Sequence, residues 1–242
     1  MQFHFVRLYK HHHRLWEYIR EELLSLTDEK YRLFTSSLLP GTENIIGVRL
    51  PDIKKIAKRL SKNGEDYRLP KNPFFEEIML LGMTTGLKRE NIENKLKSTE
   101  KFLPYIDNWS VCDSFCSCFK FRKEDTDKLF SFVTHYISSD SEFFVRFALV
   151  MLLKYFINDE YIEKTLAVLW QTNHSGYYAK TAQAWAISIC YVNFPELTEI
   201  RLSSSVPIDN FTYNTALQKI LDSKIPTEKQ KEKIRKMKRK SA

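Results

Sequence analysis

The segment that decides the fold runs from Phe143 to Leu153 and reads FFVRFALVMLL. Apart from Arg146 it contains only apolar residues, and elsewhere in the 242 residues apolar side chains recur at the three- and four-residue spacing of a helix face. No stretch sustains the alternation of apolar and polar residues that is typical of a half-buried β-strand. The sequence therefore predicts an all-α protein.

Capping residues and prolines mark where the helices begin, and glycines mark where several of them end. We expect helices over residues 14–26, 28–38, 51–62, 73–86, 90–105, 109–119, 123–138, 142–157, 159–171, 177–193, 208–222 and 227–239. The loops between them are short, which predicts antiparallel pairs of neighbouring helices.

Trp109, Arg146 and Trp185 fall in three of these helices and lie 37 and 39 residues apart. This distance is close to the period of HEAT-type repeats, each of which is a pair of helices. Such pairs stack into a curved solenoid whose concave face presents one helix of each repeat. We therefore predict a curved α-solenoid of about six HEAT-like helical repeats. The helices of the three residues should be neighbours along its concave face.

The positive charge is concentrated at the C-terminal end of the sequence. Residues 229–240 hold eight Lys or Arg and one Glu, so the other 230 residues contribute only +1 of the net charge of +8. We predict a disordered lead-in over residues 1–13, a repeat domain over 14–225 and a basic helix or tail over 226–242. The tail either contacts an acidic partner or is a solvated helix end.

Composition excludes several classes of protein. There are six glycines, and neither G-x-G-x-x-G nor G-x-x-x-x-G-K-[ST] occurs, so we expect no nucleotide cofactor. No uncharged stretch reaches the roughly 20 apolar residues that a membrane-spanning helix needs. Three histidines at positions 11 to 13 lack further ligands at metal-binding spacing, so we expect no metal.

The four cysteines indicate the redox state of the compartment in which the protein is found. Three of them, Cys112, Cys116 and Cys118, lie within one helical stretch, and the fourth is Cys190. This arrangement is unlike a secreted disulfide framework and fits a reducing cytosol. The C-x3-C-x-C spacing lacks matching ligands elsewhere, so these cysteines are expected as small core residues. We expect a cytoplasmic monomer.

Two charged residues stand alone on apolar helices. Asp113 is the one charged residue of WSVCDSFCSCF, from Trp109 to Phe119, and Arg146 is isolated in the same way in its own helix. Burying an unpaired charge costs several kcal/mol, so each residue must have a partner or face a wet groove. Trp109 and Asp113 are four residues apart and share a helical face. That face presents an indole beside a carboxylate.

Structural explanations of these residues stay open. Ser110 and Asp113 have the spacing of a capping box at a helix start, which would make Asp113 structural. Asp113 and Arg146 could instead form a buried ion pair without any chemistry. Trp185, taken by itself, is more typical of a core residue than of a site.

Four segments that follow one another in order carry a family resemblance. They are IIGVRLPDIKKIAKRL (Ile45–Leu60), IDNWSVCDSF (Ile106–Phe115), FVRFALVMLLKYF (Phe144–Phe156) and YYAKTAQAWAISICYVNFPE (Tyr177–Glu196). Together they resemble the DNA alkylation repair family of HEAT-like repeat proteins, the AlkD-type alkylpurine DNA glycosylases. The resemblance covers roughly residues 14–225.

The resemblance implies a C-shaped stack of repeats that cradles double-stranded DNA. It also implies hydrolysis of the N-glycosidic bond of N3- or N7-alkylated purines. The aromatic, carboxylate, arginine and second aromatic positions of the family look like Trp109, Asp113, Arg146 and Trp185. On this basis Asp113 would stabilise a positively charged sugar, and the two indoles would hold the deoxyribose by apolar and cation–π contact.

The same resemblance assigns phosphate contacts to Arg146, and to Lys154 and Lys180 where they face the groove. One segment departs from the glycosylases of this family. The second helix, within DEKYRLFTSSLL, is short and is followed by PGTENIIGVRLP, which resembles a branch with a reduced recognition helix. Two alternative functions are a non-catalytic DNA-binding repeat protein and a protein-binding HEAT scaffold.

Overall fold

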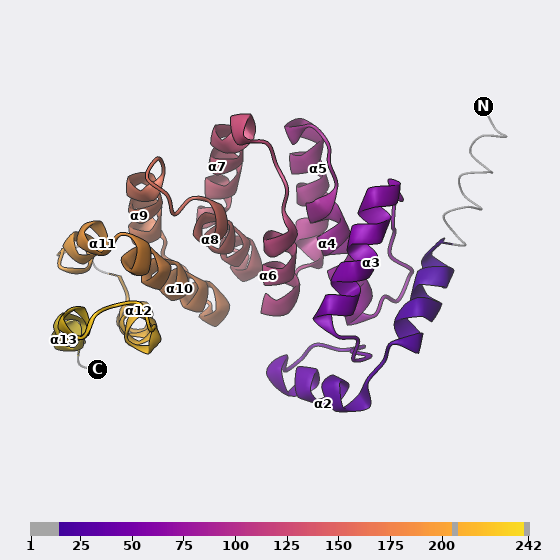
Figure 1. The fold of residues 1–242 in the computed structure, drawn as a ribbon, viewed down its shortest axis with the longest axis horizontal. Helices are drawn as coiled ribbons and strands as arrows, with labels where there is room; N and C mark the ends of the chain where they lie inside the picture. The colour runs from indigo at the N-terminus through magenta and orange to yellow at the C-terminus, as the bar shows by residue number, and fades with distance from the viewer. Residues whose placement is uncertain (1–14, 205–207, 240–242) are drawn as a thin grey trace. The chain divides into compact units, whose positions relative to one another are not determined.

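The computed structural model describes residues 15–204 and 208–239, and in these ranges all regular structure is helical (Figure 1). A helix over residues 15–25 comes first. It is followed by α2 (Glu29–Leu38), α3 (Leu50–Asn63), α4 (Phe75–Leu87), α5 (Ile92–Phe102), α6 (Trp109–Cys118), α7 (Thr126–His135), α8 (Glu142–Tyr155), α9 (Ile162–Gln171), α10 (Tyr177–Asn193), α11 (Pro195–Leu202), α12 (Asn210–Asp222) and α13 (Glu228–Met237). Short 3₁₀ turns cover Leu103–Tyr105, Lys123–Asp125 and Tyr136–Ser138. The prediction of an all-α protein is confirmed.

The chain divides into two compact units, with the boundary after Asp125. Helices α2 to α6 belong to the first unit and α7 to α13 to the second. Each unit buries apolar side chains of its own, such as Leu80 of α4 in the first and Phe147 of α8 in the second. Packing within a unit therefore positions the candidate side chains that the unit carries.

In the first unit α4 is the central helix. It packs against α3, α5 and α6, and nine of its thirteen residues are buried. Gly82 lets α5 approach closely, because a Cβ at this position would lie 2.5 Å from the ring of Phe102. As a result, α4 forms the floor on which α3 and α6 lie.

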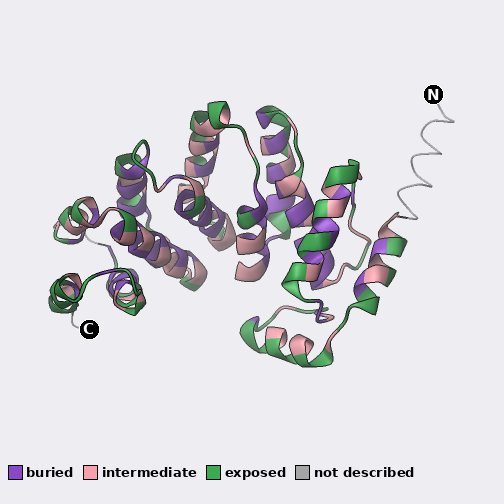
Figure 2. Ribbon diagram, in the orientation of Figure 1, coloured by how far each residue is buried: buried purple, intermediate pink, exposed green. Residues whose placement is uncertain are grey.

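In the second unit, helices two apart along the chain lie side by side. Helix α8 packs against α10 and α10 against α12, while α7, α9 and α13 pack on α8, α10 and α12 in turn (Figure 1). Figure 2 shows that α8 and α10 are mostly buried. This alternation is the packing of stacked two-helix repeats. It confirms the prediction of helical repeats and makes the helices of Arg146 and Trp185 neighbours, as expected.

Three helices differ from the sequence-based expectation, and one of them, expected over 123–138, is α7 with a 3₁₀ turn at each end. Helix α11 is missing from the expectation, because this helix has eight residues of which only Thr198 and Leu202 are buried, so no apolar stripe marks it. The helix expected over 90–105 stops at Phe102 and continues as a 3₁₀ turn that contains Pro104. Proline has no N–H with which to extend the α-helical hydrogen bonding.

The predictions for the two ends of the chain have different outcomes. The expected lead-in over residues 1–13, with its histidines, lies outside the described residues. At the other end, residues 228–237 form α13, which packs on α12 and fully buries Ile234. This part of the basic segment is a packed helix of the second unit.

Candidate functional site

The N-terminus of α6 is fixed by Asn108. Its side-chain oxygen accepts a hydrogen bond from the N–H of Val111 at 3.0 Å, and Trp109 is the first residue of the helix. Ser110 therefore lies inside the helix, and Asp113 lies in its second turn. The capping-box explanation of Asp113 is wrong, because the cap is two residues upstream of Ser110.

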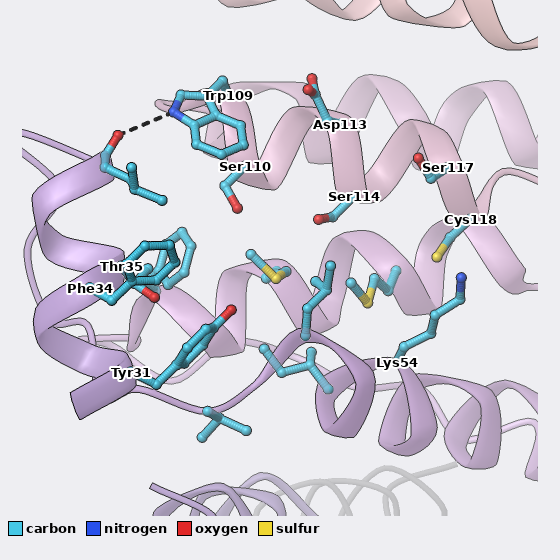
Figure 3. A pocket seen from close by; sticks show the side chains of 17 residues that line it. Tyr31, Phe34, Thr35, Lys54, Trp109, Ser110, Asp113, Ser114, Ser117 and Cys118 are labelled. Atoms are coloured by element: carbon cyan, nitrogen blue, oxygen red, sulfur yellow. Dashed lines mark hydrogen bonds between the residues drawn. The ribbon is translucent and has the colours of Figure 1, made fainter. Parts of the chain in front are cut away.

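Trp109 joins α6 to the C-terminal end of α2. Its indole Nε1 donates a hydrogen bond to the carbonyl oxygen of Leu38 at 3.4 Å (Figure 3). Both Trp109 and Asp113 are half-buried, and in Figure 3 they project from the same side of the helix, one turn apart. The indole and the carboxylate thus share one face, as the four-residue spacing predicts.

A cavity of about 370 Å³ opens beside this face, between α2, α3, α4 and α6. We call it the α6 pocket. Its walls include the rings of Tyr31 and Phe34, the thioethers of Met79 and Met83, the hydroxyls of Ser110, Ser114 and Ser117, and the side chains of Trp109 and Asp113. The lining is mainly apolar, with polar groups contributed chiefly by α6.

Helix α2 is held in place at its N-terminus. Asp28 caps it by accepting from the N–H of Tyr31 at 3.0 Å, and also accepts from Arg49 Nη2 at 2.7 Å. The hydrogen bond from Arg49, reinforced by that from Tyr31, holds the pKa of Asp28 below its usual value. The N–H of Asp28 donates to the carbonyl of Gly47 at 3.0 Å. Gly47 has a φ of 84°, and a Cβ there would lie 2.5 Å from the carbonyl oxygen of Asp28.

Buried Glu76 supports the loop that contacts α2. Its carboxylate accepts hydrogen bonds from the N–H groups of Ile46, Gly47 and Val48 at 3.1, 2.8 and 3.3 Å. Burial raises the pKa of Glu76, and the three hydrogen bonds oppose that rise. Glu76 therefore holds the loop in place, and the loop holds the N-terminus of α2. This fixes the position of Tyr31 and Phe34, which α2 carries.

In the second unit, Arg146 of α8 is only 6% exposed. Its Nη1 donates to the carbonyl oxygen of Tyr178 on α10 at 2.9 Å. A buried guanidinium needs such acceptors, which explains how an apolar helix tolerates this charge. The proposed ion pair with Asp113 joins residues of different units and stays a prediction.

Trp185 lies on α10, next to α8. It is half-buried rather than part of the core, and the exposed Lys154 places its Nζ 5.9 Å from the centre of the indole ring. On α10, the Nζ of Lys180 lies 3.4 Å from Oδ1 of Asp209, the N-cap residue of α12. Of the six sequence-predicted residues, the structure thus brings together Trp109 and Asp113 in the first unit. It places Arg146, Lys154, Lys180 and Trp185 on two adjacent helices of the second.

The sequence does not by itself predict the α6 pocket. Its aromatic wall comes from Tyr31 and Phe34, which lie on the short helix α2. One signal was present: Ser110, Ser114 and Ser117 recur at spacings of four and three and so share a helical face.

The chain was compared with known proteins. Residues 19–191 match the family described as DNA alkylation repair enzyme. The chain belongs to this family. The match includes all six predicted site residues of this DNA alkylation repair protein and ends before α11 to α13. No curated protein matched the chain.

The described part of this family member shows neither a metal-binding cluster nor a membrane-spanning helix. Within residues 15–204 and 208–239, no three His, Cys, Asp or Glu side chains gather to hold a metal ion. No helix described there is both long and apolar enough to cross a membrane. Cys112, Cys116, Cys118 and Cys190 are buried free thiols, which confirms the first three as the core residues that the sequence predicts.

Proposed function

We propose that this DNA alkylation repair protein is a DNA glycosylase that hydrolyses the N-glycosidic bond of N3- or N7-alkylated purines in double-stranded DNA. The observation that carries the proposal is the pairing of Trp109 and Asp113 on one face of α6, at the edge of the α6 pocket. Both residues lie within the segment that matches the family.

The proposed reaction suits a site with one carboxylate and no strong acid. An N3- or N7-alkylated purine is cationic, so when its bond to C1′ breaks, the electron pair of that bond neutralises the base. Water then forms the new bond to C1′ and releases a proton. The difficult species is the positively charged sugar, which the Asp113 carboxylate stabilises electrostatically.

The aromatic and basic residues bind the sugar and the phosphates of the DNA. The indoles of Trp109 and Trp185 hold the deoxyribose through apolar and cation–π contact. Exposed Lys154 and half-buried Lys180 neutralise phosphates, and Arg146 adds a further phosphate contact. We propose that the protein acts on DNA as a cytoplasmic monomer without a cofactor, and its free thiols fit a reducing compartment.

The test is a base-release assay. Duplex DNA treated with a methylating agent is incubated with the purified full chain, and free 3-methyladenine and 7-methylguanine are measured by chromatography. We expect release above the spontaneous rate, with abasic sites formed in equal number. Duplex binding without any release would reject the glycosylase and leave a non-catalytic DNA-binding protein. Absence of both would favour a protein-binding scaffold.

A further inference from the structure

A row of four aromatic rings lies where α8, α10 and α12 begin. Phe143 is the second residue of α8, Tyr177 and Tyr178 are the first two of α10, and Phe211 is the second of α12. The ring centroids of Phe143 and Tyr178 are 5.4 Å apart, and those of Tyr178 and Tyr177 are also 5.4 Å apart. The centroids of Tyr177 and Phe211 are 5.8 Å apart. These four rings, which we call the α10 ring row, cross three helices without a break.

Two rings of the α10 ring row are exposed to solvent. Tyr177 is 62% exposed and Phe211 is 43% exposed, although the two rings contact one another. Contiguous apolar surface that stays exposed is typical of an interaction site. Among the described residues, the hydroxyls of Tyr177 and Tyr178 have no hydrogen-bond partner. The row therefore offers rings for packing and two hydroxyl groups that are free to donate.

The helix ends beside the row do not offer a site for an anion. The carboxylate of Glu142 accepts hydrogen bonds from first-turn N–H groups of α10, and that of Asp209 accepts from first-turn N–H groups of α12. These are the donors that a phosphate would use at a helix N-terminus. The α10 ring row is therefore unsuited to the backbone of a nucleic acid.

The unpaired charge beside the row is negative. Lys180 Nζ lies 3.4 Å from Asp209 Oδ1, and the guanidinium of Arg239 lies 3.8 Å from the ring centre of Tyr213. Exposed Asp140, in contrast, has no hydrogen bond or ion pair on its carboxylate among the described residues. It lines a polar hollow of about 610 Å³ between the loops that lead into α8 and α10. This hollow fits the basic side chain of a lysine or arginine.

The rings, the free hydroxyls and the carboxylate together fit a proline-rich peptide. Such peptides dock as polyproline II helices on surfaces lined with aromatic rings. A polyproline II segment has no internal hydrogen bonds, so its carbonyl oxygens can accept from the two tyrosine hydroxyls. It rises 3.1 Å per residue, so about five residues cover the row.

We propose that the α10 ring row is a docking surface for a proline-rich segment of another protein, and that a basic residue of this segment enters the hollow beside Asp140. A polyproline II helix is already ordered before it binds, so a shallow row of rings is enough to hold it. The proposal goes beyond the glycosylase and does not depend on it. None of the four rings belongs to the residues proposed for base release or for DNA binding.

The test uses the purified full chain and a fluorescently labelled peptide of five prolines between two arginines, with binding measured by anisotropy. We expect saturable binding. Tyr177→Ala and Phe211→Ala should each weaken it by about 5-fold or more. Tyr177→Phe keeps the ring but removes the hydroxyl, and should weaken it roughly 2- to 10-fold. Tyr105→Ala is the matched control, because it removes a 46% exposed ring of the first unit and should bind the peptide as the wild type does.

A second set of peptides tests the charge and the proline content. Glutamates in place of the two arginines should weaken binding by roughly 2- to 5-fold, and Asp140→Asn should reduce this difference. Glycine and serine in place of the prolines should abolish binding. Thermal melting of each variant confirms that it is folded.

Three outcomes would overturn the proposal. In the first, the wild type binds the proline peptide no better than the glycine–serine peptide. In the second, the two alanine variants of the ring row bind the proline peptide as tightly as the wild type does. In the third, these variants lose affinity for a single-stranded oligothymidylate and not for the peptide, which would assign the row to DNA. Base release from alkylated duplex, measured on the same preparations, reports on the proposed glycosylase alone.

Discussion

Asp113 is the residue whose substitution separates catalysis from structure. Asp113→Asn keeps the size and hydrogen-bonding capacity of the side chain but removes its charge. If the carboxylate stabilises a cationic sugar, we expect base release to fall by about 100-fold or more. Duplex affinity should stay the same or rise slightly, because a negative charge near the phosphates is gone. Base release and duplex affinity are measured on the same preparation.

The same variant tests the ion-pair explanation of Asp113. If its main role is to neutralise buried Arg146, the substitution should lower the free energy of unfolding by about 3–5 kcal/mol. Thermal and denaturant unfolding measure this directly. A large loss of stability with an unchanged rate of base release per folded molecule would assign Asp113 to structure.

Lys95 closes the C-terminal end of α4 from inside the first unit. Its side chain is buried, and Nζ donates to the carbonyl oxygens of Thr85, Gly86 and Lys88 at 2.7, 3.0 and 2.7 Å. Methionine keeps the aliphatic length but leaves these carbonyls without that donor. We expect Lys95→Met to lower the free energy of unfolding by about 2 kcal/mol or more, measured by denaturant unfolding.

The difference in the free energy of unfolding between the wild type and Lys95→Met should depend on pH. Burial lowers the pKa of Lys95 to about 8 from its ordinary 10.5. Between these values the unfolded chain keeps a proton that the folded chain has lost, so rising pH favours the folded state. The free energy of unfolding of the wild type, relative to Lys95→Met, should therefore rise from pH 8 toward 10.5 and be flat below pH 8. If the difference in the free energy of unfolding stays constant over this pH range, the pKa of Lys95 is not lowered.

At the scale of elements, α2 is weakly held by packing. None of its residues is buried, and Figure 2 shows it largely exposed. Its position depends on the hydrogen bond from Trp109 to Leu38 and on the close contact of Gly47 with Asp28. Because α2 supplies the aromatic wall of the α6 pocket, loosening the helix should affect the pocket before it affects the fold.

Gly47→Ala tests this dependence. A Cβ at Gly47 would lie 2.5 Å from the carbonyl oxygen of Asp28, so α2 must shift. We expect faster hydrogen exchange in α2 and unchanged exchange in α4. Gly41→Ala is the matched control, because Gly41 has the same φ of 84° but nothing within 4 Å of its Cβ position. Equal exchange in both variants would show that α2 does not depend on this contact.

The sequence predicts helices better than it predicts contacts between them. Apolar spacing is a local signal, so it locates most helices and fails at α11, where few residues are buried. Asp113 and Arg146 stand out in the sequence because a lone charge on an apolar helix is costly. The sequence does not predict that Phe34 and Ser114 face one another, since this depends on how α2 packs beside α6. The capping-box alternative for Asp113 fails because Asn108, another strong N-cap residue, precedes Ser110 by two positions and caps the helix.

At the scale of the whole molecule, the net charge of +8 lies almost entirely in residues 229–240. Helix α13 contains five of the eight Lys and Arg residues of this segment and is packed, with Ile234 buried and Lys233 Nζ 2.8 Å from Glu199 Oε1. Deleting the helix would remove Ile234 from the core of the second unit. Substitution of exposed lysines therefore tests the role of the charge without changing the packing.

Lys229 and Lys236 are exposed on the basic segment, and Lys97 and Lys101 are exposed on α5. We expect Lys229→Gln/Lys236→Gln to weaken binding to alkylated and unmodified duplexes equally, because phosphate contacts carry no information on the base. Counterion release predicts that the slope of log affinity against log salt decreases by about 0.9 for each lysine that neutralises a phosphate. Lys97→Gln/Lys101→Gln makes the same change in net charge elsewhere and should leave the slope nearly unchanged. An equal decrease in both variants would indicate a general effect of net charge, and no decrease in either would make α13 a solvated helix that contacts no DNA.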